Sequence, residues 1–422
     1  MLAIFQQLAR QFEACFPAQL AGPRTVGREA EYPVVTQDGQ AGDGRRVFQA
    51  LMAANELRPT PDSGNPGLIV RLDGLDYSYT LEVGLGTIEV NTGPCQDLFR
   101  LREQHEQAVQ RLREACQGLG YRLLGYGIQP RTPPSLALMT PKQRYQVLHQ
   151  AMGDSWLWYT VTASDQLQVD IARPELVRMI NYGNLITPVI IALCANSPVY
   201  AGQESGLCSA REGRMLDIYP EEQRHGMVRR PFRDMTDYVA TMSQARCFVR
   251  REGTLYRVYN RPFTEYLAEH GPDFDAFLLH EHYIWNSARA RTAYGTLELR
   301  SACQQPWDGH MAAAALYLGL VEAAEPVERY LEALFGEALW PRMQAYHRQA
   351  IARGLAGPEP APGFLERLLD LAQEALAHRG WGEEALLQPL FQALAVGKNP
   401  AQRIVTVFRS QGLAGLLDAT AL

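Results

Sequence analysis

The sequence predicts an α+β fold, in which a curved, mainly antiparallel sheet is backed by helices and followed by a helical C-terminal part. Four stretches within the first 308 residues read as strands whose acidic or amide side chains lie opposite their apolar ones. Helical patterns lie between these stretches, and only helical patterns follow residue 309. We therefore expect an α+β part over residues 1–308 and a helical part over residues 309–422 packed on it.

The first two elements are predicted to be an amphipathic helix over residues 2–16 and a strand over residues 26–35. Glu29 and Glu31 share one face of this strand, because strand side chains alternate. Two carboxylates on one strand face favour a bound cation or neighbouring arginines. A solvated edge strand is the alternative.

A second pair of glutamates follows a helix over residues 45–57 and strands at 68–72, 77–83 and 87–91. Glu82 and Glu89 lie seven residues apart, so a straight strand would point them in opposite directions. Gly84 and Gly86 permit a bulge or tight turn that brings both to the same side. A long helix over residues 96–118 comes next.

The middle of the chain combines basic and amide side chains. After a loop at residues 127–134, Thr140 is expected to cap a helix that carries Lys142 and Arg144 near its N-terminus. Residues 165–171 alternate cleanly and place Gln166 and Gln168 on one strand face. Residues 211–227 are polar, irregular and rich in arginine, so we expect a loop that contacts substrate.

The apolar stretch over residues 174–194 predicts a helix that covers the back of the sheet. Its longest apolar run, around residues 185–195, is interrupted by Thr187 and Pro188 and is too short to cross a bilayer. We therefore expect no membrane partner.

Residues 294–307 form the most informative strand. Leu297 and Leu299 point one way, whereas Thr296, Glu298 and Arg300 point the other. A carboxylate and a guanidinium side by side on a rigid element suit a magnesium nucleotide, with Glu298 on the metal and Arg300 on a phosphate oxygen. The alternative is a surface ion pair.

Helical patterns over residues 310–335, 337–353, 364–379 and 383–396 make up the C-terminal part, with a linker rich in proline and glycine at 357–363.

Composition excludes several classes of function. The formal net charge is -6 and no basic block stands out, which argues against a nucleic-acid partner. Only two lysines occur, Lys142 and Lys398, so bound phosphates must be met mainly by arginine. The seven cysteines are widely spaced without a CxxC pair, and the N-terminus lacks the pattern of a signal peptide. Both observations predict a cytoplasmic protein.

Several carboxylates gathered on one face of a sheet would repel one another unless cations lay between them. Two or more Mg²⁺ ions that bridge nucleotide phosphates would remove this repulsion. The residues therefore predict a Mg-nucleotide enzyme that transfers a phosphoryl group. The sequence contains neither a Walker loop nor a GxGxxG motif.

Six motifs in order resemble glutamate–cysteine ligase family 2, within the glutamine synthetase-like carboxylate–amine ligase superfamily. They are Gly27-Arg-Glu-Ala-Glu-Tyr32, residues 81–90, Met139-Thr-Pro-Lys-Gln-Arg-Tyr145, Leu167-Gln-Val-Asp170, Ala195-Asn-Ser-Pro198 and Gly295-Thr-Leu-Glu-Leu-Arg300. Residues 346–355 are similar to a late helix of some branches of the family. The resemblance covers roughly residues 24–357.

The resemblance implies a glutamine synthetase-like catalytic barrel over residues 1–308 that uses ATP and magnesium to join glutamate to cysteine through a γ-glutamyl phosphate, as in glutathione biosynthesis. It implies Glu298 and Arg300 as catalytic residues, and these further site residues: metal ligands Glu29, Glu31, Glu82, Glu89 and Glu298, with Gln168 nearby; nucleotide-binding Lys142, Arg144 and Arg300; and substrate-binding Arg214, Arg224 and Arg289.

Two departures from the family pattern concern the substrate. Ala30 stands between the first two acids, and the loop after Arg214 is slightly shorter than in the plant-like branch. The alternatives are therefore a carboxylate–amine ligase with another amine, a guanidino kinase of the same fold, or a relative without catalysis.

Overall fold

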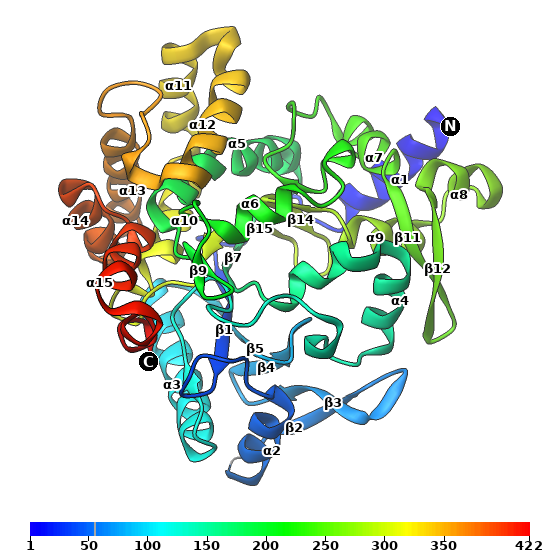
Figure 1. Ribbon diagram of the computed structural model, residues 1–422. Coiled ribbons are helices and arrows are strands. Elements are labelled where there is room, and N and C mark those ends of the chain that lie inside the picture. Colours follow the sequence, from blue (N-terminus) through cyan, green and yellow to red (C-terminus); the bar gives the residue numbers. More distant parts are fainter. Residues whose placement is uncertain (55) are drawn as a thin grey trace.

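A nine-stranded sheet lies at the centre of the computed structural model, which describes residues 1–54 and 56–422 (Figure 1). The strand order is β14-β15-β7-β1-β5-β4-β3-β2, with β6 added to β1, and its pairings are antiparallel. The strands are β1 Val26–Val35, β2 Arg58–Asp62, β3 Asn65–Asp73, β4 Tyr77–Leu81, β5 Thr87–Cys95, β6 Arg122–Leu123, β7 Ser164–Asp170, β14 Ala288–Arg291 and β15 Thr296–Cys303. The predicted antiparallel sheet is confirmed. It is open, with β14 and β2 at its edges, rather than closed into a barrel.

Three two-stranded ribbons accompany the sheet. They are β8 Val199–Tyr200 with β9 Gln203–Glu204, β11 Arg246–Glu252 with β12 Leu255–Pro262, and the parallel pair β10 His225–Gly226 with β13 Trp285–Asn286.

Helices surround the sheet and dominate the C-terminal part. Those before the last strand are α1 Leu2–Ala14, α2 Gly44–Ala54, α3 Leu98–Gly118, α4 Gln143–Met152, α5 Leu176–Cys194, α6 Ala210–Leu216, α7 Met235–Ser243, α8 Phe263–His270 and α9 Phe274–His282. The later ones are α10 Ala312–Glu322, α11 Ala324–Phe335, α12 Leu339–Arg353, α13 Phe364–Arg379, α14 Gln388–Val396 and α15 Pro400–Thr420. Helices α10 to α15 gather on one side of the molecule, and α1, α7, α8 and α9 lie on the other (Figure 1).

The expected elements are found with several differences. The predicted helix at 310–335 divides into α10 and α11 at Ala323, and α15 and the proline-containing β2 were not predicted. The predicted helix over 45–57 extends too far, because α2 ends at Ala54 and residues 56 and 57 are not helical. Asn55 is not among the described residues.

Another difference concerns residues 211–227. This segment begins in α6, whose N-terminus is capped by Ser209: its hydroxyl accepts a hydrogen bond from the Glu212 amide at 3.3 Å. The prediction of an irregular loop was therefore wrong at its start.

Thr140 does not cap α4, contrary to the prediction. Its hydroxyl donates to the Glu82 carbonyl at 2.6 Å and its amide donates to the Val83 carbonyl at 2.8 Å, so the helix begins only at Gln143. The segment before α4 is thereby tied to the end of β4, which places Lys142 beside the glutamates of that region.

One hydrophobic cluster connects α1, β7, α5, β14 and β15 with α10, α12 and α13. A second cluster packs α2 and α3 against β1, β3, β4 and β5. The first cluster crosses residue 308, so the C-terminal helices share their core with the sheet. The division into two parts at this residue stays a prediction.

Helix α5 lies at the heart of the first cluster. The segment Arg173–Cys194 is long and apolar enough to cross a membrane by length and composition alone, which corrects the expectation that it is too short. However, 83% of its most apolar window is buried inside the protein, as expected for a core helix. Gly183 allows close packing on the sheet, since a Cβ there would lie 2.6 Å from Ala288 Cβ.

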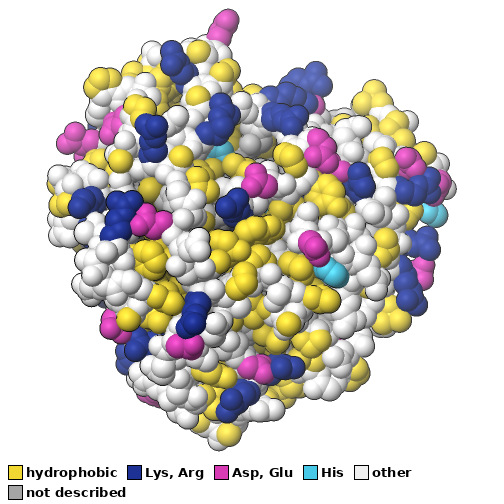
Figure 2. All heavy atoms as spheres, viewed as in Figure 1, with side chains coloured by type: hydrophobic (Ala, Val, Ile, Leu, Met, Phe, Trp, Pro, Cys, Tyr) yellow, Lys and Arg dark blue, Asp and Glu magenta, His cyan; other side chains and the backbone are white. Residues whose placement is uncertain are grey.

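The surface viewed in Figure 2 carries Lys and Arg side chains interspersed with Asp and Glu side chains. No continuous basic patch covers this face, which agrees with the negative net charge.

Candidate active site

A cavity of about 450 Å³ lies against the polar face of the sheet. Residues paired across two antiparallel strands point to the same face of the sheet. Glu31 is paired with Glu89, and Glu298 is paired with both Gln168 and Arg289. The residues of the nine-stranded sheet around the cavity are Arg71, Thr80, Glu29, Glu31, Glu89, Asn91, Ser164, Gln166, Arg289, Arg291, Glu298 and Arg300.

Glu82 reaches the same cavity by the turn that the glycines predicted. The Glu82 amide donates to the Thr87 carbonyl at 3.3 Å, and the Thr87 amide donates to the Gly84 carbonyl at 3.0 Å. A Cβ on Gly84 would lie only 1.9 Å from the carbonyl oxygen of Thr160, so this close approach requires glycine. The structure thus brings all five predicted glutamates, Glu29, Glu31, Glu82, Glu89 and Glu298, to one cavity.

Four of these carboxylates form an acidic end of the cavity. Burial and the neighbouring Glu82 raise the pKa of Glu31 to about 7. Burial, followed by repulsion from Glu82, Glu29 and Glu31, raises the pKa of Glu89 well above its usual value. Burial and repulsion from Glu298 also raise the pKa of Glu29. A cation bound here would relieve this repulsion.

Lys142 lies at the acidic end and Arg144 also borders the cavity, and their nucleotide-binding role stays a prediction. The Lys142 ammonium donates to the Leu81 carbonyl and, at 3.3 Å, to the Tyr145 hydroxyl. Burial lowers the pKa of Lys142 to about 8, although Glu82 opposes this shift.

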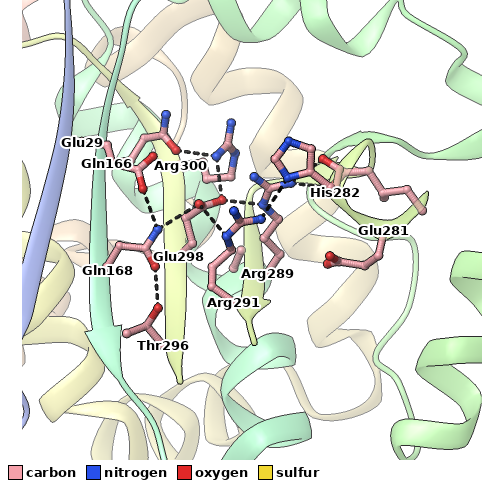
Figure 3. A network of polar contacts seen from close by, with 12 residues as sticks. Glu29, Gln166, Gln168, Glu281, His282, Arg289, Arg291, Thr296, Glu298 and Arg300 are labelled. Atoms are coloured by element: carbon pink, nitrogen blue, oxygen red, sulfur yellow. Dashed lines mark hydrogen bonds and ion pairs between the residues drawn. The ribbon is translucent and has the colours of Figure 1, made fainter. Parts of the chain in front are cut away.

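Glu298 is surrounded by three arginines (Figure 3). Its Oε2 accepts hydrogen bonds from Arg289 Nε and, at 2.6 Å, from Arg300 Nη1, and its Oε1 lies 3.4 Å from Arg291 Nε. Burial alone would raise the pKa of Glu298, but Arg289, Arg300 and Arg291 outweigh it and hold the pKa well below its usual value. Glu298 therefore orients three guanidinium groups, and its metal-ligand role stays a prediction.

Two glutamines connect this arginine group to the acids. Gln166 accepts a hydrogen bond from Arg300 Nη1. Gln168 donates to Glu29 at 3.0 Å and to Glu298 at 2.9 Å, and its oxygen accepts from Thr296 Oγ1 at 2.6 Å. Gln168, the expected neighbour of the metal, thus bridges two of the predicted ligands.

Two of the three arginines predicted to bind substrate do not border the cavity. Arg224 is buried, donates to Glu222 at 2.7 Å and to the Tyr283 carbonyl at 2.7 Å, and lies 4.0 Å from the centre of the Phe248 ring. Arg214 lies over the Trp158 ring at 5.5 Å. Neither guanidinium group borders the cavity in this structure, and the substrate-binding role of these two arginines stays a prediction. Arg289 does border the cavity.

Arg211 borders the cavity in place of Arg214. It pairs with Glu212, and its Nη2 donates to the Arg300 carbonyl at 3.0 Å. The sequence reasoning missed Arg211 because it treated this segment as a loop. Helix periodicity would have identified the residue, since positions 211 and 215 share a face and Met215 also borders the cavity.

A second feature that the sequence did not predict is an aromatic wall, formed by Trp156, Tyr159, His225 and Trp285. All four side chains border the cavity. The His225 ring stacks on Trp285 with 5.2 Å between centroids and 9° between planes, and the Tyr159 hydroxyl lies 2.6 Å from His225 Nε2. These residues come from three separate segments, so no local pattern connects them.

The donor set suits a magnesium nucleotide better than a site made of protein alone. Within residues 1–54 and 56–422, no three His, Cys, Asp or Glu side chains are arranged to hold one ion together. Magnesium usually takes one or two carboxylates and completes its shell with water and substrate phosphates. The acidic end offers such carboxylates on adjacent strands.

Comparisons with known proteins agree on one family. The model of glutamate–cysteine ligase family 2 matches residues 25–415. The chain is 24% identical over 365 residues to the chloroplastic glutamate–cysteine ligase of Medicago truncatula, covering 81% of this chain and 70% of the relative. It is 23% identical over 363 residues to chloroplastic glutamate–cysteine ligase A of Oryza sativa subsp. indica, covering 79% and 70%.

The fold is also similar to a solved structure. The crystal structure of glutamate–cysteine ligase from Francisella tularensis in complex with AMP aligns with a TM-score of 0.54 and 11% sequence identity. The alignment covers 94% of this chain and 87% of that one, which shows a shared fold over nearly the whole molecule.

Proposed function

Because this chain belongs to glutamate–cysteine ligase family 2, we propose that it joins the γ-carboxylate of L-glutamate to the amine of L-cysteine, with ATP as co-substrate. The observation that carries this proposal is the cavity itself, in which a buried group of carboxylates lies next to a group of arginines inside the matched region. This arrangement suits a magnesium nucleotide beside an anionic substrate.

The proposed reaction has two steps. A γ-carboxylate oxygen of glutamate attacks the γ-phosphorus of ATP, and the bond to the bridging oxygen breaks to release ADP. The lone pair of the uncharged amine then forms the C–N bond, the C–O electron pair leaves with phosphate, and phosphate takes the amine proton. Each step is therefore balanced in atoms and charge.

Arg300 is the residue best placed to stabilise charge on the transferring phosphoryl group. Its guanidinium is fixed by Glu298 and Gln166, and such preorganisation is what makes a charge-stabilising donor effective. Lys142 and Arg144 would contact the nucleotide phosphates. Arg211 and Arg289 are the candidates for the carboxylates of glutamate.

Magnesium would be held at the acidic end by Glu29, Glu31, Glu82 and Glu89 together with the nucleotide. Two or more ions would supply the positive charge that lets phosphates approach these carboxylates. The raised pKa values of Glu31 and Glu89 support this assignment, since both carboxylates lie near other acids.

We also propose that the protein works in the cytoplasm. All seven cysteines are free thiols and six of them are buried, which fits a reducing compartment.

The test is an assay of turnover with MgATP, glutamate and a panel of amines. The released ADP and phosphate are quantified, and the mass of the product is measured. We expect phosphate release that depends on both glutamate and cysteine, and a γ-linked dipeptide. Faster turnover with another amine would favour a different carboxylate–amine ligase of this fold. Release of AMP with pyrophosphate, or a phosphorylated guanidine, would reject the proposal.

A further inference from the structure

The aromatic wall is held rigidly inside the cavity. Trp156 and Tyr159 lie 4.7 Å apart between ring centroids, and Tyr159 lies 4.9 Å from Trp285. His225 completes the wall by stacking on Trp285 and by its hydrogen bond to Tyr159. Its surface is mostly apolar, and its polar groups are the hydroxyl–imidazole pair and the indole N–H groups of the two tryptophans.

Backbone hydrogen bonds fix the wall next to Arg300. His225 is paired with Trp285 across the ribbon of β10 and β13. Ser287, two residues later, donates to the Gly226 carbonyl at 3.0 Å and accepts from the Arg300 amide at 2.9 Å. The Arg300 side chain extends to Gln166 and Glu298. Arg300 thus connects the wall to the carboxylates.

The environment of the wall disfavours a positive charge. Burial, followed by Arg300, Arg224, Arg211 and Arg289, lowers the pKa of His225 well below its usual value. The same burial and the same arginines would lower the pKa of an ammonium group placed beside His225. These surroundings therefore favour the uncharged form of an amine bound here, which is the nucleophilic one.

The other substrates of the proposed reaction have charged partners elsewhere. The nucleotide has Lys142 and the acidic end, and the carboxylates of glutamate have Arg211 and Arg289. The wall offers no charge of its own, and aromatic rings make favourable contacts with sulfur. It therefore suits the third substrate, a small thiol-bearing amine.

We propose that the aromatic wall is the subsite of the acceptor amine, in which the Tyr159 oxygen accepts a hydrogen bond from the amine nitrogen while Tyr159 donates to His225 Nε2. A hydroxyl oxygen has two lone pairs, so both contacts can form together. His225 is then a positioning residue that orients Tyr159. This inference rests on the proposed function, because it assigns a subsite to one of its substrates.

The test compares Tyr159→Phe with the parent in two reactions. With cysteine as acceptor, the variant should show a KM for cysteine raised by about tenfold, because one hydrogen bond to the amine is lost. Its KM values for glutamate and MgATP should stay within about twofold. Hydroxylamine has no side chain to pack on the wall, and its saturating concentration offsets the loss of one hydrogen bond to its nitrogen. Formation of γ-glutamyl hydroxamate should therefore also stay within about twofold.

Tyr200→Phe is the matched control, because Tyr200 packs on Trp158 outside the cavity and should leave every constant unchanged. For His225, the variant His225→Gln keeps an acceptor for the Tyr159 hydroxyl and should raise the KM for cysteine less than His225→Leu does. A purely structural role would instead lower the melting temperature of both variants without separating the KM values.

The outcomes distinguish the inference from the proposed function. If the parent forms no hydroxamate from glutamate and MgATP, the proposed function fails and the inference fails with it. If the parent is active but Tyr159→Phe leaves the KM for cysteine unchanged, or raises the KM for glutamate or MgATP equally, only the inference is overturned.

Discussion

At the scale of single residues, Arg300 combines the two properties that a charge-stabilising group needs. Its guanidinium is fixed, since it donates to both Glu298 and Gln166, and it faces the cavity that holds the acids. Glu298 itself is only 1% exposed, which rules out the alternative of a surface ion pair. The planar fork of arginine therefore matters here as well as its charge.

We predict that Arg300→Lys lowers kcat by at least about a hundredfold and leaves the melting temperature nearly unchanged. The loss of one preorganised donor to developing charge costs about 3–4 kcal/mol. Single-turnover rates and thermal melts of the variant and the parent would measure both effects. Arg214→Lys is the control, because Arg214 lies outside the cavity, and near-normal turnover of Arg300→Lys would contradict the assigned role.

At the scale of elements, the buried carboxylates on β1, on β5 and after the end of β4 repel one another. The pKa of Glu31 is raised to about 7, so its folded-state value exceeds its ordinary one. A carboxyl group with a raised pKa contributes stability that is complete below about pH 4.5 and is lost as the pH rises through about 7. Above that pH the unpaired negative charges destabilise the folded protein.

We predict that saturating Mg²⁺ raises the melting temperature more at about pH 8 than at about pH 5.5. The ion binds deprotonated carboxylates, and these are the forms that the fold disfavours without it. In Glu31→Gln, the rise in melting temperature caused by Mg²⁺ should differ less between the two pH values. Glu332→Gln, on the exposed face of α11, should leave this difference unchanged. Equal shifts at both pH values would contradict a magnesium site at these carboxylates.

The packing of α5 behind β14 and β15 depends on a single glycine. A Cβ at Gly183 would lie 2.6 Å from Ala288 Cβ and 3.0 Å from Leu299 Cδ2. Because interiors are densely packed, the helix and the two strands would have to move apart.

We predict that Gly183→Ala lowers the free energy of unfolding by about 1–3 kcal/mol through overpacking. Gly118→Ala is the matched control within a helix, since a Cβ there meets no atom within 4 Å, and it should be neutral or slightly stabilising. Urea unfolding curves of both variants would give the comparison. An unchanged free energy for Gly183→Ala would show that the sheet accommodates the methyl group.

At the scale of the whole molecule, the C-terminal helices complete the core of the sheet. The large hydrophobic cluster includes residues of α5 and β15 as well as α10, α12 and α13. A buried ion pair adds to this link, because Arg28 binds Asp165 on β7 and donates to the His310 carbonyl at 2.7 Å. The parts before and after residue 308 are therefore held together by both apolar and polar contacts.

We predict that residues 1–308 alone do not fold, because the apolar surface of α5 and β15 would lose its cover. Circular dichroism of this fragment should show no cooperative melting, whereas the full chain should unfold in one transition. A fragment that melts cooperatively would instead establish residues 1–308 as an independent domain.

The polar face of the sheet could be predicted because it depends on local chain geometry. Alternation along a strand is a property of the backbone, so Glu29 with Glu31, Gln166 with Gln168, and Glu298 with Arg300 had to share faces pairwise. The turn at Gly84 was predictable for the same reason, since glycine permits the close approach that the turn needs. The buried stripe of α5 followed from its apolar composition.

The sequence by itself thus determined the antiparallel strands, the acidic side of the sheet and the family to which the chain belongs. Only the tertiary structure decided that Arg211 rather than Arg214 or Arg224 meets the cavity, that Tyr159 meets His225, and that the last helices share the central core. The physical reason is the length scale of the interactions. Backbone periodicity acts over a few residues, whereas these contacts join segments far apart in the chain and form only when the whole molecule packs.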